Sequence, residues 1–117
     1  YRDLLVWQKS MELVKAVYMA TRTFPEEEKF GLTSQLRRSC ISIPSNIAEG
    51  QAREGTREFI HFLSIARGSL AEVDTQLLLA RDFSYIYQTE YDALLTRIDE
   101  LQRMLYRLIK RLEEDHV

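Results

Sequence analysis

The sequence predicts an all-α fold, an antiparallel up-down-up-down four-helix bundle that forms a single domain over residues 1–117. Apolar residues recur at alternating spacings of three and four along four long segments, which is the pattern of one helix face. The chain has 4 glycines and 2 prolines, whereas a β-sandwich of this length needs many more turn residues. Because the connections between the segments are short, successive helices are expected to be antiparallel neighbours.

The first helix is expected to run from Asp3 or Leu4 to about Arg22, with Asp3 as its N-cap. The Phe-Pro pair at 24–25 should end it, because the residue before a proline is pushed out of helical geometry. Phe30, in the acidic connection that follows, is expected to fold back onto the bundle. The predicted core stripe of this helix is formed by Trp7, Met11, Val14 and Tyr18, widened by Leu13 and Val17.

The second helix has a proline inside its apolar pattern. It is expected to begin with a cap at Thr33 or Ser34 and to end near Gly50, which suits a C′ glycine. Pro44 lacks an N–H and crowds the preceding turn, at a cost of about 3 kcal/mol, so we expect a bend there. The bend serves either core packing or a recognition surface. Four small polar residues around it should satisfy freed backbone groups or bond to a neighbouring helix: Ser39, Ser42, Ser45 and Asn46.

The third helix, from Thr56 to about Asp82, has the clearest pattern. Its predicted core stripe is Phe59, Leu63, Ala66, Leu70, Val73, Leu77 and Ala80. Its other sides are also apolar, at Ile60, Phe62, Ile65, Ala71, Leu78 and Leu79. Gly68 falls opposite the stripe, where a mid-helix glycine costs about 1 kcal/mol and therefore indicates a close helix contact. We expect a second subunit to cover this side, with Ile65, Gly68 and Leu79 at the interface.

The fourth helix is expected to begin at a capping box formed by Thr89 and Asp92. Its predicted core stripe is Leu94, Ile98, Leu101, Leu105, Leu108 and Leu112. No run of about eighteen apolar residues occurs anywhere in the sequence, so we expect no membrane span. A cytoplasmic protein is the resulting expectation.

Few residues in the sequence are candidates for catalysis or metal binding. Glu58 and His61 have the Glu-x-x-His spacing of di-iron bundles, but such sites need two pairs and two further inward-facing glutamates. This single pair falls opposite the core stripe. The lone Cys40 lies on an apolar face, where a thiol behaves as a small hydrophobic group. The serines near Pro44 have no histidine close in sequence, and the glycines match no nucleotide-binding motif. The sequence therefore predicts no enzyme, no metal and no cofactor.

Basic residues offer a second interpretation. The formal net charge is −2, which argues against strong nonspecific binding of nucleic acid by the whole surface. Four cations nevertheless share one side of the fourth helix, and a further doublet lies on the second helix. Such a stripe either follows a phosphate backbone or is a solvated face paired with Glu100, Glu113 and Glu114. The residues concerned are Arg37, Arg38, Arg103, Arg107, Lys110 and Arg111.

Three segments together resemble a known bacterial family. They are LLVWQKSMELV at 4–14, SQLRRSCISIPSNIAEG at 34–50 and TREFIHFLSIARGSLAEVDTQL at 56–77. In this order they look like the four helix bundle protein family. That family includes proteins encoded in intervening sequences of large-subunit ribosomal RNA genes and the accessory variability determinant of diversity-generating retroelements. The matching motif positions, which support a shared architecture, are Arg37, Arg38, Pro44, Asn46 and Glu49.

The resemblance implies a four-helix bundle that assembles into a cyclic homopentamer. In the retroelement protein, a strongly basic pentamer binds nucleic acid and a reverse transcriptase, whereas the present chain has a negative net charge. Two hypotheses of function follow. The first is a non-enzymatic oligomeric scaffold or interaction protein, whose partners are its own copies or another protein. The alternative is an RNA- or DNA-binding ring that uses the basic residues of the second and fourth helices.

Overall fold

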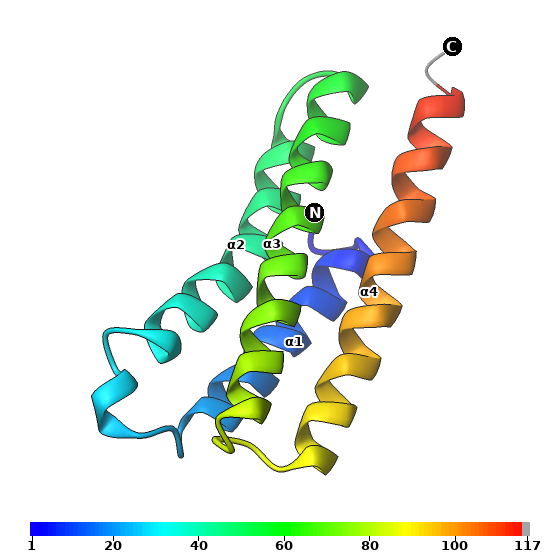
Figure 1. Ribbon diagram of the computed structural model, residues 1–117. Coiled ribbons are helices and arrows are strands. Elements are labelled where there is room, and N and C mark those ends of the chain that lie inside the picture. Colours follow the sequence, from blue (N-terminus) through cyan, green and yellow to red (C-terminus); the bar gives the residue numbers. More distant parts are fainter. Residues whose placement is uncertain (116–117) are drawn as a thin grey trace.

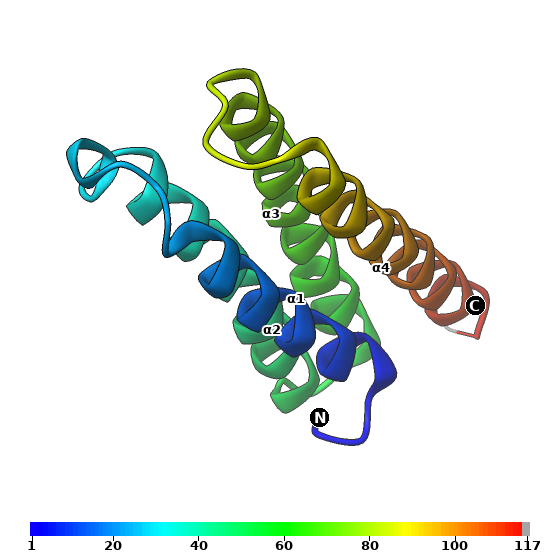
Figure 2. The ribbon, with the colours of Figure 1, turned by 90° about the horizontal axis from the view of Figure 1, so that it is seen from below.

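The computed structural model describes residues 1–115, which form four α-helices and one short 3-10 helix (Figure 1). The α-helices are α1 (Leu5–Thr21), α2 (Leu32–Ala52), α3 (Thr56–Asp82) and α4 (Gln88–Asp115), and η1 (Glu26–Glu28) lies between α1 and α2. Each helix packs against the next one in the chain, and α1 also packs against α4 (Figure 2). The predicted four-helix bundle is confirmed. Within the described residues, no helix is long and apolar enough to cross a membrane.

The core runs along the inner faces of all four helices. The third predicted stripe is buried from Leu63 to Ala80, and Phe59 at its start is half-buried. The fourth stripe is buried up to Leu105, after which Ile109 is buried instead of Leu108. Leu108 lines a groove beside the first residues of α1, whereas Ile109 lies on the side of α4 where Gln102 bonds to α3. The shorter α1 does not extend along the last turns of α4, so the buried face of α4 shifts to the α3 side.

The buried face of α1 differs from the predicted one. Leu13 and Val17 are buried as expected, but the predicted stripe at Trp7, Met11, Val14 and Tyr18 is only half-buried. The buried line instead consists of Val6, Ser10, Leu13, Val17, Ala20 and Thr21. Ser10 interrupts this line in the sequence. Its burial is tolerated because its hydroxyl donates a hydrogen bond to the Trp7 carbonyl at 2.7 Å.

The predicted caps of the first two helices are wrong. Leu4, and not Asp3, is the N-cap of α1, and among residues 1–115 no side chain caps that end. Residues 33–34 lie inside α2. The carboxylate of Glu28 accepts a hydrogen bond from the Leu32 N–H at 3.2 Å, which satisfies one of the free donors at the start of α2.

The predicted capping box of α4 is also wrong, because Thr89 lies within the first turn of the helix. Glu90, which the prediction did not include, accepts a hydrogen bond from the Tyr87 N–H at 3.1 Å. This is the carboxylate half of a capping box, placed two residues earlier than predicted.

The prediction that Phe30 folds back onto the bundle is wrong, since its side chain is 90% exposed. Other residues anchor this connection. Phe24 is buried against Tyr85, with ring centres 5.5 Å apart, and the Tyr85 hydroxyl donates a hydrogen bond to Glu28 at 2.8 Å. These contacts join the α1–α2 and α3–α4 connections and leave Phe30 in solvent.

Gly50 is not the C′ residue of α2, because the helix continues to Ala52. A Cβ atom at Gly50 would lie 2.7 Å from the Cβ of Phe62 and 3.1 Å from a ring carbon of Phe59. Glycine is therefore needed here for the close approach of α2 to α3. The neighbouring Glu49 is exposed and pairs with Arg53 at 2.8 Å.

Helix α2 continues through the buried Pro44 without interruption, and the bend expected there stays a prediction. The prediction that surrounding polar residues bond to a neighbouring helix is confirmed at Ser39 and Ser42, whose hydroxyls bond to α3. The Asn46 amide donates hydrogen bonds to the Ser42 carbonyl at 2.8 Å and to the Ser42 hydroxyl at 2.9 Å. The Ser42 hydroxyl also lies 2.9 Å from the Ser69 hydroxyl on α3. The Ser42 hydroxyl thus joins α2 to α3, and Asn46 bonds to Ser42 from the same helix.

Candidate interaction surfaces

The outer face of α3 exposes large apolar side chains and one bare helical glycine. Ile65, Leu78 and Leu79 are 38%, 37% and 42% exposed. Among the described residues, no heavy atom lies within 4 Å of the place that a Cβ would take at Gly68. The close contact predicted at Gly68 is thus not made within the subunit. Small exposed residues continue the same face at Ser64, Ala71 and Thr75.

A polar groove of about 390 Å³ lies between α2 and α3, beside this face. In addition to the Ser42–Ser69 contact, the Ser39 hydroxyl donates to Glu72 at 3.4 Å. Arg38 lines the same groove and is exposed. The buried Oε1 of Gln76 has no hydrogen-bond partner within residues 1–115. The serines therefore bond to polar groups across the α2–α3 boundary, with Ser69 and the Glu72 carboxylate as their partners on α3.

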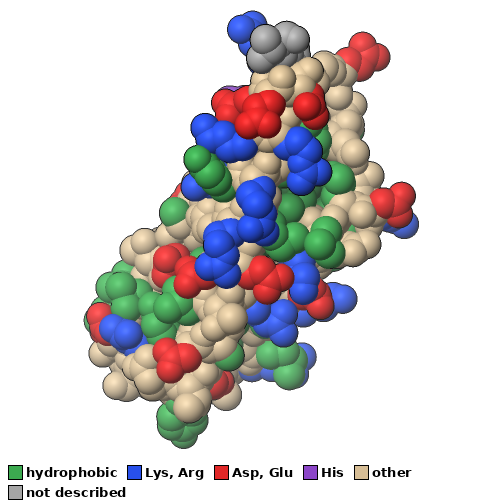
Figure 3. All heavy atoms as spheres, turned by 90° about the vertical axis from the view of Figure 1, so that its right-hand side faces the viewer, with side chains coloured by type: hydrophobic (Ala, Val, Ile, Leu, Met, Phe, Trp, Pro, Cys, Tyr) green, Lys and Arg blue, Asp and Glu red, His purple; other side chains and the backbone are tan. Residues whose placement is uncertain are grey.

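The outer face of α4 is basic. Residues 101–112 contain four cations and no aspartate or glutamate, and all four cations are exposed. Figure 3 shows this side of the molecule, with Lys and Arg side chains along its length. Lys110 pairs with Glu113 at 3.6 Å, whereas Glu100 pairs with Lys9 on α1 at 3.4 Å. In the part of the chain that the structure describes, no carboxylate lies within ion-pair distance of Arg103, Arg107 or Arg111.

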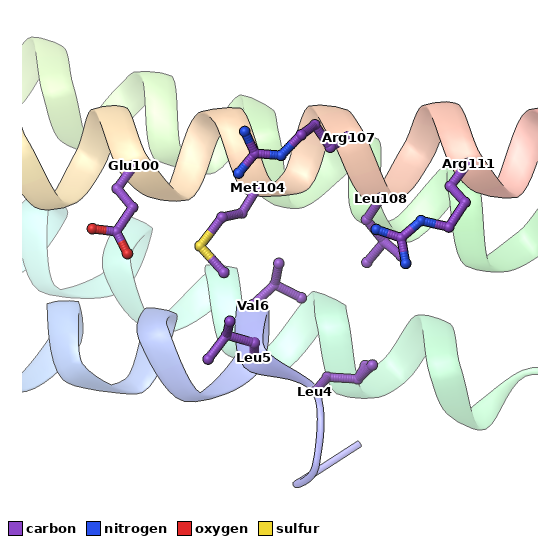
Figure 4. Close-up of a pocket in the computed structure, with 8 residues that line it drawn as sticks. All are labelled: Leu4, Leu5, Val6, Glu100, Met104, Arg107, Leu108 and Arg111. Carbon is purple, nitrogen blue, oxygen red and sulfur yellow. The ribbon is translucent and has the colours of Figure 1, made fainter.

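A groove of about 650 Å³ borders this basic face, where the start of α1 meets the middle of α4 (Figure 4). Figure 4 shows the Met104 side chain pointing from α4 toward Leu5 and Val6. The lining is apolar apart from three charged side chains, and consists of Leu4, Leu5, Val6, Glu100, Met104, Arg107, Leu108 and Arg111. The groove exists because α1 begins opposite the middle of α4, so that the later turns of α4 extend beyond it.

The arginine doublet of α2 does not join the basic face of α4. The Arg37 side chain packs on α1, where its guanidinium carbon lies 4.5 Å from the Tyr18 ring centre and its Nε donates to the Thr21 hydroxyl at 2.9 Å. Arg38 lies in the α2–α3 groove. The structure thus brings together Arg103, Arg107, Lys110 and Arg111, but places the doublet on other sides of the bundle.

A further cluster around Tyr106 was not predicted from the sequence. The Tyr106 ring is 45% exposed, and the charged groups of Arg67 on α3 and Lys110 on α4 each lie 5.4 Å from its centre. The Arg67 Nε donates to Gln102 at 3.0 Å, and the Gln102 amide donates to the Arg67 carbonyl at 3.2 Å. The spacing of Tyr106 and Lys110 is visible in the sequence, but the contribution of Arg67 depends on the packing of α3 against α4.

The residues that the sequence offered for metal binding or catalysis lie at separate places in the structure. Glu58 and His61 are both exposed on α3. Among residues 1–115, no group of three or more His, Cys, Asp or Glu side chains is placed to hold a metal ion. Cys40 is buried as expected, and burial raises the pKa of its thiol to about 12 because desolvation penalises the thiolate. A thiol in this environment is protonated at neutral pH.

The 23S rRNA-intervening sequence protein family matches residues 2–107. A similar solved structure is the crystal structure of a protein with unknown function from the S23 ribosomal protein family of Bacteroides thetaiotaomicron. The two chains are 29% identical with a TM-score of 0.82, and the match covers 94% of this chain and 99% of that chain. No curated protein matches the chain. Because the family match extends over nearly the whole sequence, the chain belongs to the 23S rRNA-intervening sequence protein family.

Proposed function

We propose that this chain is a non-enzymatic interaction protein whose subunits assemble through the outer face of α3. The observation that carries the proposal is the exposure of Ile65 and Leu79 on either side of the bare Gly68. A solvent-facing helix normally has charged or polar residues on its outer side. Exposed apolar residues around a position that allows close approach of another backbone are typical of a helix–helix interface.

A second copy of the chain is the occupant that this face suits best. Burial of apolar side chains contributes about 25 cal/mol per Å² removed from water. The same surface occurs on every copy. Contact of this face with itself gives a two-fold dimer, whereas contact with a different patch of the next copy gives a ring where the rotation closes. The homopentamer implied by the family resemblance is one such ring.

The mass of the untagged protein in solution tests this proposal. The subunit has a mass of 13.8 kDa, so light scattering at micromolar concentration should give a multiple of that value. A folded species of 13.8 kDa at the same concentration would contradict self-association.

A second candidate function, RNA or DNA binding, is favoured by the basic face of α4. Arg103, Arg107 and Arg111 recur every four residues, and each is exposed without an ion-pair partner among the described residues. Cations of this kind release condensed counterions when they meet phosphates, so the affinity should fall steeply with salt. In a ring, each subunit would present its own basic face of α4, and this repetition raises the effective affinity for RNA or DNA.

The salt dependence of binding tests this second candidate. A labelled RNA should bind more weakly as the salt concentration rises, with a slope that reflects several phosphate contacts on a log–log plot. Absence of RNA and DNA binding even at low salt would leave the α4 cations as a solvated face.

A further inference from the structure

We propose that Tyr106 is a stacking platform for an unpaired nucleobase, flanked by the cations of Arg67 and Lys110. This inference rests on the candidate nucleic-acid binding by the α4 face. It adds the class of ligand that the face selects, which is a single strand with accessible bases.

The position of Tyr106 is not explained by the packing of the bundle. Its ring is almost half exposed and does not belong to the apolar core or to the side chains packed against it. On the helix it lies beside Arg103 and Lys110, three residues before it and four residues after it. An aromatic ring is therefore held at the surface among exposed cations that form no part of the core.

The two flanking cations are held differently. Arg67 is fixed by the reciprocal hydrogen bonds with Gln102, so its guanidinium is already in place beside the ring. Lys110 is exposed, and its only ion pair among the described residues is the solvent-exposed one with Glu113. Exposed pairs of this kind are weak. Lys110 can therefore leave the ring for a phosphate when a base takes its place.

A nucleobase should bind the Tyr106 ring more strongly than the Lys110 ammonium group does. Stacking of a nucleobase on an aromatic side chain is stronger than an exposed cation–π contact of lysine. Arg103, Arg107 and Arg111 recur at about 6 Å along the axis of α4, since each residue of a helix adds 1.5 Å. A strand that stacks one base on Tyr106 thus finds phosphate-binding cations on both sides of it.

This arrangement distinguishes single strands from duplexes. A duplex keeps its bases paired and stacked, so it meets the same face only through its phosphates. A single strand can use both the phosphates and a base. Tyr106 therefore contributes to binding of single-stranded RNA or DNA and contributes nothing to binding of a duplex of equal charge.

The test measures the affinity of the full chain for labelled oligouridylate, for oligothymidylate and for an RNA duplex. Tyr106→Leu removes the aromatic ring, keeps an apolar side chain and should weaken binding of single strands about tenfold or more. Tyr106→Phe keeps the ring and should bind like the wild type. Tyr87, which is 79% exposed and lies before the first turn of α4, supplies the matched control. Tyr87→Leu should have no effect. Affinities that differ between oligouridylate and oligothymidylate would show which of the two strands the site prefers.

A second measurement confirms that the effect is stacking. An oligonucleotide that contains 2-aminopurine should lose fluorescence on binding to the wild type and keep it with Tyr106→Leu. If Tyr106→Leu binds single strands like the wild type while reversal of Arg103 and Arg107 abolishes binding, the platform is disproved and nucleic-acid binding stands. If the wild type binds neither strands nor duplex at low salt, both proposals fail.

Discussion

The outer faces of α3 and α4 differ sharply, although both helices bury their inner faces in the same core. α3 has no charged residue between Glu58 and Arg67, and it leaves Ile65 and Leu79 exposed. α4 buries or half-buries its leucine and isoleucine residues and exposes its cations, with four in residues 101–112. Of the two, only α4 has the strict division into apolar and charged sides that water favours.

This difference indicates two kinds of partner. An apolar face with a bare glycine gains free energy when another apolar surface covers it. A basic face whose three arginines have no carboxylate partner among the described residues gains free energy when a polyanion approaches. If the two faces act independently, changes on α3 should alter assembly and changes on α4 should alter binding of nucleic acid.

The largest expected effect is on assembly, from Leu79→Glu. A carboxylate at a closely packed subunit interface would lose its hydration, so the protein should become a folded monomer of 13.8 kDa by light scattering. Phe30→Glu makes the same change at a more exposed residue outside α3 and should leave the mass unchanged. Retention of the wild-type mass by Leu79→Glu would remove α3 from the interface.

The next effect concerns the basic face. Arg103→Glu combined with Arg107→Glu should weaken RNA binding more than tenfold and reduce the dependence on salt, because phosphate contacts are lost. Lys15→Glu combined with Arg22→Glu changes the net charge equally, at an exposed position of α1 and at its exposed C-cap residue. Equal losses of affinity in the two double variants would mean that net charge, and not the α4 face, governs binding.

Two glycines allow the inner and outer sides of the bundle to be compared directly. Gly50→Ala should destabilise the subunit by about 1–3 kcal/mol, since the new Cβ overlaps the Cβ of Phe62. Gly68→Ala meets no neighbour within the described subunit and should stabilise it by about 1 kcal/mol through helix propensity. Gly68→Ala should also weaken assembly if a second subunit packs closely against α3 at this position. Denaturant titrations and solution mass separate the two results.

The smallest expected effect is on the pH dependence of stability, and it comes from Cys40 in the core. Burial raises the pKa of its thiol from 9.0 to about 12, so above pH 9 the unfolded chain loses a proton that the folded chain retains. The free energy of unfolding should therefore fall as the pH rises above 9, by up to about 1.4 kcal/mol per pH unit. Cys40→Ala should reduce this slope in denaturant titrations. An unchanged slope would assign the loss of stability to other groups.

The fold could be predicted from the sequence where periodicity alone decides the buried face. The stripes of α3 and α4 have this character, because each predicted stripe position from Leu63 to Ala80 and from Leu94 to Leu105 is apolar and buried. The face of α1 was missed because Ser10 satisfies its hydroxyl within its own helix and so can be buried. A polar residue of this kind looks like a surface residue in the sequence.

Features that depend on distant neighbours were less predictable. Gly50 and Gly68 both lie inside helices, but only the structure shows that Gly50 faces Phe62 and that Gly68 is open. The basic stripe of α4 was visible in the sequence, whereas the contact of Tyr106 with Arg67 depends on how α3 lies against α4. The capping role of Glu28 likewise comes from a carboxylate in the preceding connection.

The independence of the two faces is tested most directly by a crossed measurement. Leu79→Glu and the Arg103→Glu, Arg107→Glu double variant would each be measured by light scattering, with absorbance at about 260 and about 280 nm on the same peak. The first should have the mass of one subunit, while the second should retain the wild-type mass without co-purified nucleic acid. A monomeric double variant, or a Leu79→Glu protein that stays assembled, would contradict the division of roles between α3 and α4.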